Sequence, residues 1–212
     1  MTDWVEVHPG AVHLPRFLAL AEQRRVVEQC RAIGSGPTGW YVPTVRGGGK
    51  MRVRMVCLGR HWNARTYRYQ ASRGDHDGRP APPLPSSLSA IAQRIAGAAG
   101  MRLTPDVCIL NHYDAVGKMG LHQDKDERPD ALEACIPVVS LSLGDTAKFI
   151  IGGLDRRDPK VMVRLESGDG FVLGGQSRLR FHGVAAIVPC TGPPELELDG
   201  RFNLTFREGA TG

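Results

Sequence analysis

The chain lacks the features that hold a small secreted domain together or anchor a protein in a membrane. It has five cysteines, an odd number, and no C-x-x-C pair, which argues against a disulfide framework and against a zinc ribbon. No stretch approaches about 18 continuous apolar residues, and residues 1–12 lack a basic segment followed by an apolar run. We therefore expect no membrane span, no signal peptide and a location in the reducing cytoplasm.

Acidic residues are scarce in one segment, although the net charge of the whole chain is only +5. Between Arg46 and Arg79, nine basic residues stand against Asp75 and Asp77, which gives +7 and leaves −2 for the rest of the chain. A local positive patch of this kind is typical of a protein that binds a polyanion. A solvated basic face without a partner is the alternative.

Length and turn residues limit the fold class. A chain of 212 residues fits one domain, residues 1–212, and can bury enough surface to fold without a disulfide or a structural metal. Its 26 Gly and 15 Pro favour many turns and short strands. Apolar residues at helical spacing predict helices over Pro15–Ile33 and Ser86–Ala99, the second with a serine as its N-cap. The polar, proline-broken stretch Arg60–Pro85 predicts a surface excursion.

Short strands separated by turns dominate the second half of the chain. They are predicted over Val107–Tyr113, Pro137–Leu143, Ala147–Ile151, Val161–Glu166, Gly170–Leu173, Arg180–Val188 and Arg201–Arg207. Strands at this spacing favour a sandwich or a barrel such as a jelly roll. We therefore expect an α+β, mainly β protein, with a helical region over about residues 1–100 and a double-sheet core over about residues 101–212.

The segment Asn111–Glu127 (NHYDAVGKMGLHQDKDE) carries the most informative pattern. His122 and Asp124 are two residues apart, so in an extended segment an imidazole and a carboxylate point to the same side and can bind one ion. His182, in a later strand, would supply a third ligand. Two His and one carboxylate on one face of an octahedral ion are typical of non-haem Fe(II) oxygenases. The alternatives are a satisfied core histidine for His182 and a solvent-facing loop histidine for His122.

The last predicted strand alternates without exception. Its polar face carries Arg201, Asn203, Thr205 and Arg207, and its other face carries three apolar residues. The apolar face must pack in the core, and buried guanidinium groups need partners. Because arginine grips a carboxylate with two parallel hydrogen bonds, the polar face predicts a pocket for a dicarboxylate beside the metal. An exposed edge strand with charged ends is the alternative.

These motifs together resemble the AlkB family of dioxygenases, and the bacterial type most closely. The family's features occur in order as N-x-Y (Asn111, Tyr113), LHQDKDE (Leu121–Glu127), SLSLG (Ser140–Gly144), GGL (Gly152–Leu154), GGQSRL (Gly174–Leu179), HG (His182, Gly183) and RFNLTFR (Arg201–Arg207). The resemblance covers roughly residues 51–207. The resemblance is specific because HxD with a distant His occurs together with RxNxTxR. The His–Asp–His pattern alone, or RxNxTxR alone, would be only suggestive.

The resemblance implies a double-stranded β-helix core, a nucleotide-recognition lid over residues 46–79, and an oxidoreductase that uses Fe(II), 2-oxoglutarate and dioxygen. The expected catalytic iron ligands are His122, Asp124 and His182. The expected 2-oxoglutarate ligands are Asn111, Tyr113, Arg201, Asn203 and Arg207. In the family's reaction an N-alkyl group is oxidised while 2-oxoglutarate becomes succinate, and formaldehyde leaves the repaired base.

The same resemblance implies that the substrate is an alkylated base in DNA, single- or double-stranded, with RNA as a second option. The expected nucleotide contacts are Trp62, Tyr67, Tyr69, Asp126 and Arg156. Trp62 would stack on the base against His122, and Asp126 would accept a hydrogen bond from its exocyclic amine. Without the resemblance, Asp126 would be interpreted as a solvated turn residue. Leu173 stands where bacterial relatives often have Trp, so one wall of the pocket is expected to be less aromatic.

Three other functions fit parts of the pattern. A 2-oxoglutarate oxygenase could act on a protein or a small molecule, which Trp62 and the basic segment argue against. A non-catalytic nucleic-acid-binding module would use the β core as a scaffold and would bind without His122 and Asp124. A jelly-roll protein could bind zinc structurally, but structural zinc usually takes four ligands that include Cys, and no cysteine lies near the His–Asp motif. A monomer is expected, because the sequence has no long exposed apolar stripe.

Overall fold

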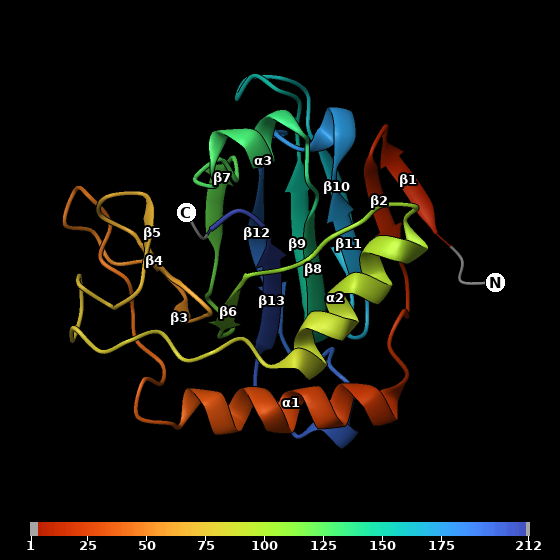
Figure 1. Ribbon diagram of the computed structural model, residues 1–212. Coiled ribbons are helices and arrows are strands. Elements are labelled where there is room, and N and C mark those ends of the chain that lie inside the picture. Colours follow the sequence, from red (N-terminus) through yellow and green to blue (C-terminus); the bar gives the residue numbers. More distant parts are fainter. Residues whose placement is uncertain (1–3, 211–212) are drawn as a thin grey trace.

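Two antiparallel sheets form the body of the computed structural model, which describes residues 4–210 (Figure 1). The large sheet has seven strands in the spatial order β1 (Val5–His8), β2 (Ala11–Leu14), β11 (Gly170–Leu173), β8 (Val138–Gly144), β13 (Arg201–Arg207), β6 (Val107–Tyr113) and β3 (Arg54–Leu58). The small sheet has four strands in the order β10 (Val161–Leu165), β9 (Thr146–Ile151), β12 (His182–Val188) and β7 (Met119–His122). Neighbouring strands in both sheets are antiparallel. The predicted mainly β fold with a double-sheet core is confirmed.

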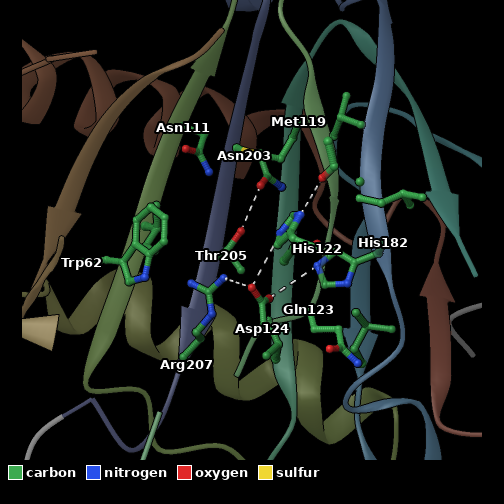
Figure 2. A pocket seen from close by; sticks show the side chains of 18 of the residues that line it. Trp62, Asn111, Met119, His122, Gln123, Asp124, His182, Asn203, Thr205 and Arg207 are labelled. Carbon is green, nitrogen blue, oxygen red and sulfur yellow. Dashed lines mark hydrogen bonds and ion pairs between the residues drawn. The ribbon is translucent and has the colours of Figure 1, made fainter. Parts of the chain in front are cut away.

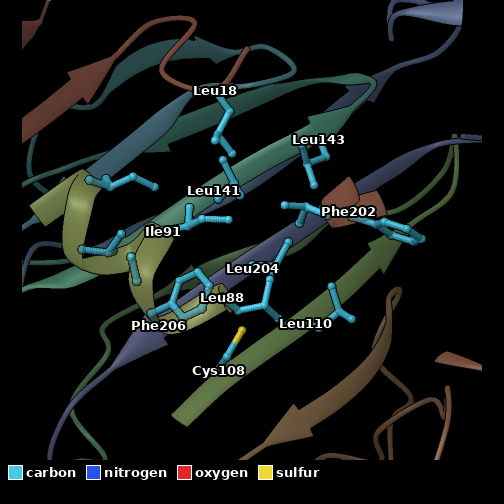
Figure 3. Close-up of a cluster of buried hydrophobic side chains, with 14 of the residues drawn as sticks. Leu18, Leu88, Ile91, Cys108, Leu110, Leu141, Leu143, Phe202, Leu204 and Phe206 are labelled. Atoms are coloured by element: carbon cyan, nitrogen blue, oxygen red, sulfur yellow. The ribbon is translucent and has the colours of Figure 1, made fainter. Parts of the chain in front are cut away.

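The last strand, β13, lies inside the large sheet between β8 and β6. All seven of its residues pair with residues of β6. Because side chains alternate across a strand, its apolar residues Phe202, Leu204 and Phe206 are buried together on the side that faces the helices (Figure 3). Its polar residues line the space between the two sheets. Both faces of this strand were therefore predicted correctly from its alternation.

Two helices cover the outer face of the large sheet. The helices α1 (Leu20–Gly34) and α2 (Ser86–Ala98) bury their apolar sides in one cluster with the apolar residues of β13. The predicted start of the first helix at Pro15 is wrong. Arg16 adopts a left-handed conformation with φ 50°, and its backbone N–H donates to the side chain of Asp169, so the helix begins only after this turn.

Most predicted elements lie within two residues of their observed bounds. The second helix ends one residue early, and its N-cap is Pro85 and not a serine. The strand expected from Arg180 begins at His182, because the N–H of Arg180 closes a turn with the carbonyl of Ser177. Strands β1, β2, β3 and β7 and the short helix α3 (Pro129–Glu133) were not predicted. Three of these strands have only four residues each, too few to show a clear period.

A second apolar cluster fills part of the space between the two sheets. It includes Phe149 and Val184 from the small sheet and Phe171 and Leu173 from the large sheet. The same four side chains line a cavity between the sheets. The cluster therefore gives that cavity an apolar wall, to which Leu173 contributes as expected.

The predicted surface excursion after β3 contains an ordered hairpin. Strands β4 (His61–Asn63) and β5 (Arg68–Gln70) pair beside the body of the molecule (Figure 1). Nε2 of the buried His61 lies 2.6 Å from Oδ1 of Asp75, and the buried Arg73 donates to two backbone carbonyls of the loop after α1. The first contact joins the hairpin to the loop that follows it, and the second attaches that loop to the rest of the fold.

Along the described residues, no helix is long and apolar enough to cross a membrane. The five cysteines are unpaired, and Cys30, Cys57 and Cys108 are buried. Burial raises the pKa of Cys30 and Cys57 to about 12, so both thiols stay protonated at neutral pH. The prediction that no disulfide framework holds the fold is confirmed for these residues.

Candidate functional site

A cavity of about 650 Å³ lies between the two sheets. Its volume is within the range of about 300–1,000 Å³ typical of small-molecule sites. Strands β13 and β6 supply residues of its wall on the large sheet, and β7, β9 and β12 supply residues on the small sheet. The β4–β5 hairpin borders the cavity with Trp62 and Tyr69. The cavity therefore joins the β core to the basic, aromatic segment of the chain.

Three potential metal ligands, His122, Asp124 and His182, meet on the wall of this cavity (Figure 2). His122 ends β7 and His182 begins β12, and the antiparallel register pairs the two directly. Nε2 of His122 lies 3.7 Å from Asp124 Oδ1, and Nε2 of His182 lies 3.6 Å from Asp124 Oδ2. One ligand atom from each residue lies within 4.8 Å of the others. The structure thus brings together the three residues that the sequence predicted as metal ligands.

The second ring nitrogen of each histidine contacts a backbone carbonyl. Nδ1 of His122 lies 2.8 Å from the oxygen of Gly120, and Nδ1 of His182 lies 2.9 Å from that of Arg180. Because a carbonyl only accepts, each Nδ1 carries the proton and each Nε2 turns its lone pair to the cluster. Burial and the neighbouring His182 lower the pKa of His122 to about 4. His122 is therefore neutral at pH 7, as a metal ligand must be.

Asp124 keeps its negative charge in spite of being buried. Burial would raise its pKa, but Arg207 and the two histidines hold it well below its usual range. Arg207 donates from Nη2 to Asp124 Oδ1 at 2.7 Å. The cluster therefore offers two imidazoles and one carboxylate, a donor set that fits Fe(II) and leaves room for further ligands on the metal.

Arg201, on the polar face of β13, is buried without a carboxylate partner among the described residues. It donates to the carbonyls of Asp145 and Leu165 at 3.2 and 3.1 Å and to the hydroxyl of Ser142 at 2.6 Å. Its Nε has no partner within residues 4–210. Burial lowers the pKa of Arg201 to about 10, so the group is still charged at neutral pH. A buried charge of this kind is costly unless an anion completes it.

Two more buried polar atoms on the cavity wall have no hydrogen-bond partner in the described part of the chain. They are Nη1 of Arg207 and Oδ1 of Asn111. Tyr113 lines the same wall, and burial raises the pKa of its hydroxyl to about 12, so this hydroxyl remains a donor. Together with Nε of Arg201, these groups provide two guanidinium donors and further polar contacts beside the metal ligands. The residues present therefore fit a small dicarboxylate such as 2-oxoglutarate.

Asn203 also lines the cavity, but its amide already has partners. Its Nδ2 donates to the carbonyl of Leu141 at 3.3 Å, and its Oδ1 accepts from the hydroxyl of Thr205 at 3.0 Å. An amide nitrogen has two hydrogens, so one remains for a bound ligand. The predicted contact between Asn203 and 2-oxoglutarate stays a prediction.

The predicted nucleotide contacts all border the cavity: Trp62, Tyr67, Tyr69, Asp126 and Arg156. Figure 2 shows Trp62 on the opposite side of the drawn site from His182. The indole nitrogen of Trp62 donates to Asp126 Oδ2 at 2.8 Å, so Asp126 is not a freely solvated turn residue. Tyr67 meets Trp62 edge-on, with ring centroids 6.0 Å apart. The exposed Arg156 donates to the carbonyl of Leu121 at 2.8 Å.

Two buried charged residues at the site were not predicted from the sequence. Glu127 and Arg178 are buried, and Nη2 of Arg178 lies 3.0 Å from Oε2 of Glu127. Both stand inside recognisable motifs, LHQDKDE and GGQSRL. The sequence showed only that a charged residue stands in each of these two motifs. The spacing of the two residues along the chain did not indicate that their side chains would meet.

The comparisons with known proteins agree with this geometry. The family model described as the 2OG-Fe(II) oxygenase superfamily matches residues 10–207. The alpha-ketoglutarate-dependent dioxygenase AlkB of Salmonella typhimurium is 40% identical over 98% of this chain and 94% of its own length. The chain belongs to the AlkB family. Membership confirms the predicted double-stranded β-helix fold and the predicted dependence on Fe(II) and 2-oxoglutarate.

Plant relatives are similar in sequence but longer. The DNA N(6)-methyladenine demethylase ALKBH1C of Arabidopsis thaliana is 37% identical over 95% of this chain and 49% of its own length. The chain spans about half the length of this protein and of two further plant relatives. The solved structure of OsALKBH1 matches with a TM-score of 0.91 and 39% identity, over 97% of this chain and all of that chain. The chain therefore shares its fold with OsALKBH1 over nearly its whole length.

Proposed function

We propose that the chain removes alkyl groups from nucleic-acid bases by Fe(II)- and 2-oxoglutarate-dependent oxidation. The observation that carries this proposal is that three groups of residues share one cavity: the His122–Asp124–His182 cluster, the polar face of β13, and the Trp62–Asp126 pair. The first suits a redox metal, the second suits a dicarboxylate, and the third suits a planar base that carries a hydrogen-bond donor. A protein or small-molecule substrate would give no reason for the third group.

Each part of the iron and co-substrate site has a role in this proposal. His122, Asp124 and His182 would hold Fe(II), which with 2-oxoglutarate and dioxygen supplies oxidation of an N-alkyl carbon and release of succinate and carbon dioxide. Arg201 and Arg207 would bind the carboxylates of 2-oxoglutarate through their unpaired nitrogens. The apolar cluster between the sheets keeps water away from this end of the cavity.

The alkylated base would reach the cavity from a single strand or after flipping out of a duplex. The base would stack on Trp62, with His122 on its other face. Stacking of a base on an aromatic side chain contributes about 1–3 kcal/mol of binding free energy per base. Oδ2 of Asp126 accepts from Trp62, so Oδ1 is available for an exocyclic amine. Tyr67 and Arg156 would contact the nucleotide outside the ring. The hydroxymethyl product would then break at its C–N bond: the hydroxyl proton and formaldehyde leave, the electron pair of that bond returns to the ring nitrogen, and the unmodified base is restored.

We rank ring-alkylated bases of the 1-methyladenine and 3-methylcytosine type first, in DNA and then in RNA. These bases keep an unmodified exocyclic amine that can donate to Asp126. N6-methyladenine ranks second, because the Arabidopsis thaliana relatives are named as demethylases of that base. The exposed Arg65 and Arg68 flank the aromatic residues of the hairpin, and they would supply phosphate affinity that falls with salt.

An anaerobic preparation supplied with Fe(II), 2-oxoglutarate and an oligonucleotide carrying one 1-methyladenine tests the proposal. When oxygen is admitted, we expect the oligonucleotide to lose one methyl group, with succinate and formaldehyde formed in equal amounts. His122→Ala and Asp124→Ala variants should still bind the oligonucleotide but should not convert it. Demethylation by these variants would contradict the proposed metal site. Wild-type protein that decarboxylates 2-oxoglutarate but demethylates no oligonucleotide would favour a protein or small-molecule substrate.

We also propose a monomer in the reducing cytoplasm. The five unpaired cysteines are typical of that compartment. The metal ligands, the polar face of β13 and the aromatic wall all come from one chain. Sedimentation equilibrium should therefore give one species of about 23.0 kDa with full activity.

A further inference from the structure

Four buried charged side chains form a ring that includes the metal ligand Asp124 and borders the cavity. Its members, Asp124, Glu127, Arg178 and Arg207, are each at most 8% exposed. Arg207 pairs with Asp124 Oδ1 through Nη2 at 2.7 Å and with Glu127 Oε1 through Nε at 3.1 Å. Arg178 closes the ring, because it pairs with Glu127 Oε2 at 3.0 Å and donates to the backbone carbonyl of Asp124. Two cations and two anions thus alternate around the ring.

Arg207 has its three nitrogens directed at three different targets. Nε faces Glu127, Nη2 donates to Asp124, and Nη1 is buried without a hydrogen-bond partner among residues 4–210. A guanidinium is rigid and planar, so fixing two of its nitrogens also fixes the direction of the third. The carboxylate of Glu127 therefore determines where Arg207 presents its unpaired N–H.

Arg178 acts on the backbone around the metal ligand. Its Nη1 donates to the carbonyl of Asp124, and its Nε donates to the carbonyl of Ile136 at 2.6 Å. It therefore ties the segment that carries Asp124 to the residues that lead into β8. Its third nitrogen pairs with Glu127, so one buried side chain holds both the metal-ligand segment and the carboxylate that directs Arg207.

Buried ion pairs give little net stability, because the cost of removing two charges from water offsets much of their attraction. A ring of this kind is better explained by the geometry that it imposes. We propose that Glu127 and Arg178 are positioning residues, which hold Asp124 as a metal ligand and direct Arg207 at a carboxylate of 2-oxoglutarate. This inference rests on the proposed function, and it concerns Glu127, which borders the cavity, and Arg178, which does not line it.

A double variant, Glu127→Gln with Arg178→Met, removes the pair without leaving a net charge or a large hole, so it is expected to fold. Calorimetry would measure the binding of Mn(II), as a redox-stable probe, and then of 2-oxoglutarate. Loss of groups that support metal ligands typically costs about 10- to 100-fold in affinity. We expect at least a tenfold loss for both ligands and a raised KM for 2-oxoglutarate, with an unchanged KM for the methylated oligonucleotide.

The matched control is Arg31→Met. Arg31 also donates to two backbone carbonyls, those of Leu196 and Glu197, but it does not line the cavity. This variant should bind Mn(II) and 2-oxoglutarate like the wild type. A comparable loss of affinity in the control would mean that any lost arginine clamp weakens binding, and it would overturn the positioning role.

A folded double variant with wild-type affinity for both ligands would also overturn the inference. If the double variant does not fold, Arg178→Lys replaces it, because lysine keeps the charge but loses the planar fork. The lysine variant should show the same split between the two KM values, and wild-type 2-oxoglutarate affinity would contradict the proposal. If the wild type itself does not bind 2-oxoglutarate in the presence of Mn(II), the proposed function fails as well, so the two failures are distinguishable.

Discussion

The indole N–H of Trp62 donates to the carboxylate of Asp126 across 2.8 Å, although 64 positions separate the two residues in the chain. The bond holds the indole ring and the carboxylate together on the cavity wall. For the proposed substrate, both groups would be oriented before a base binds, which would lower the entropy that binding has to overcome.

Replacing Asp126 with Asn should reduce kcat/KM for a 1-methyladenine oligonucleotide about tenfold. If the amide oxygen accepts from Trp62, the amide NH2 faces the exocyclic amine, and two donors then meet; such base contacts are worth about 1–3 kcal/mol. A base without an exocyclic amine, such as 3-methylthymine, should be nearly unaffected. The ratio of the two rates, measured in competition, is the test, and equal losses on both bases would contradict this role of Asp126.

An Arg201→Lys variant should need roughly 10- to 100-fold more 2-oxoglutarate to reach half its maximal rate. Lysine keeps the charge but loses the fork, and a hydrogen bond to a charged group is worth about 1.5–3 kcal/mol. The oligonucleotide Kd should not change, since Arg201 lies on β13 inside the cavity. Arg164→Lys, on the exposed side of β10, is the control. A change in oligonucleotide Kd without a change in the 2-oxoglutarate KM would refute the assignment.

A His182→Ala variant should lose the stabilisation that a bound metal gives to the folded state. For the wild type, Mn(II) at about 100 times its Kd should add about 2.7 kcal/mol to the free energy of unfolding. The variant lacks one of three ligand atoms and should show almost no shift in Tm with Mn(II), together with no turnover. His76→Ala, which removes a ring stacked on Tyr41 in the hairpin region, should keep the full shift. A metal-induced shift in the His182 variant equal to that of the wild type would rule out His182 as a ligand.

Acid should destabilise the hairpin region through His61. Burial lowers the pKa of His61 below its ordinary value of 6.5, against the opposing effect of Asp75. Because the unfolded chain binds this proton more readily than the folded chain, the contribution of neutral His61 is complete above about pH 6.5 and is lost as the pH falls below it. Below about pH 6.5, the free energy of unfolding should fall by up to about 1.4 kcal/mol for each pH unit.

This prediction is checked by urea unfolding of the wild type and of a His61→Gln variant. Both are measured at about pH 7.5 and about pH 5.5, on either side of the pH range in which the contribution of His61 is lost. The variant should show a shallower dependence on pH, whatever its stability at pH 7.5. Identical slopes would mean that His61 takes up its proton equally well in the folded and unfolded chain.

Local patterns predicted the parts of the site that lie on one element. The alternation of Arg201–Arg207 separated its two faces correctly, because a strand with one apolar face can bury that face in only one way. The two-residue spacing of His122 and Asp124 also indicated that the two side chains meet, which they do at 3.7 Å, although Asp124 lies just beyond the end of β7. The strand β7 that ends at His122 was not predicted, since four residues that include Gly120 show no clear period.

Relationships between distant segments could not be predicted in this way. The pairing of His182 with His122 depends on β12 lying beside β7, which no local pattern determines. The meeting of Glu127 with Arg178 has the same origin. The early left-handed turn at Arg16 also escaped prediction, because it is held by the distant side chain of Asp169.

The sequence by itself determined the residue types of the site, the two faces of the last strand, the local excess of positive charge and, through its motifs, the family. Only the tertiary structure decided which nitrogen of each histidine is free, which guanidinium nitrogens lack partners, and that Trp62 is fixed by Asp126. The physical reason is that spacing along a strand fixes directions only within that strand. Contacts between strands depend on sheet order and register, and these arise when both apolar clusters are buried at the same time.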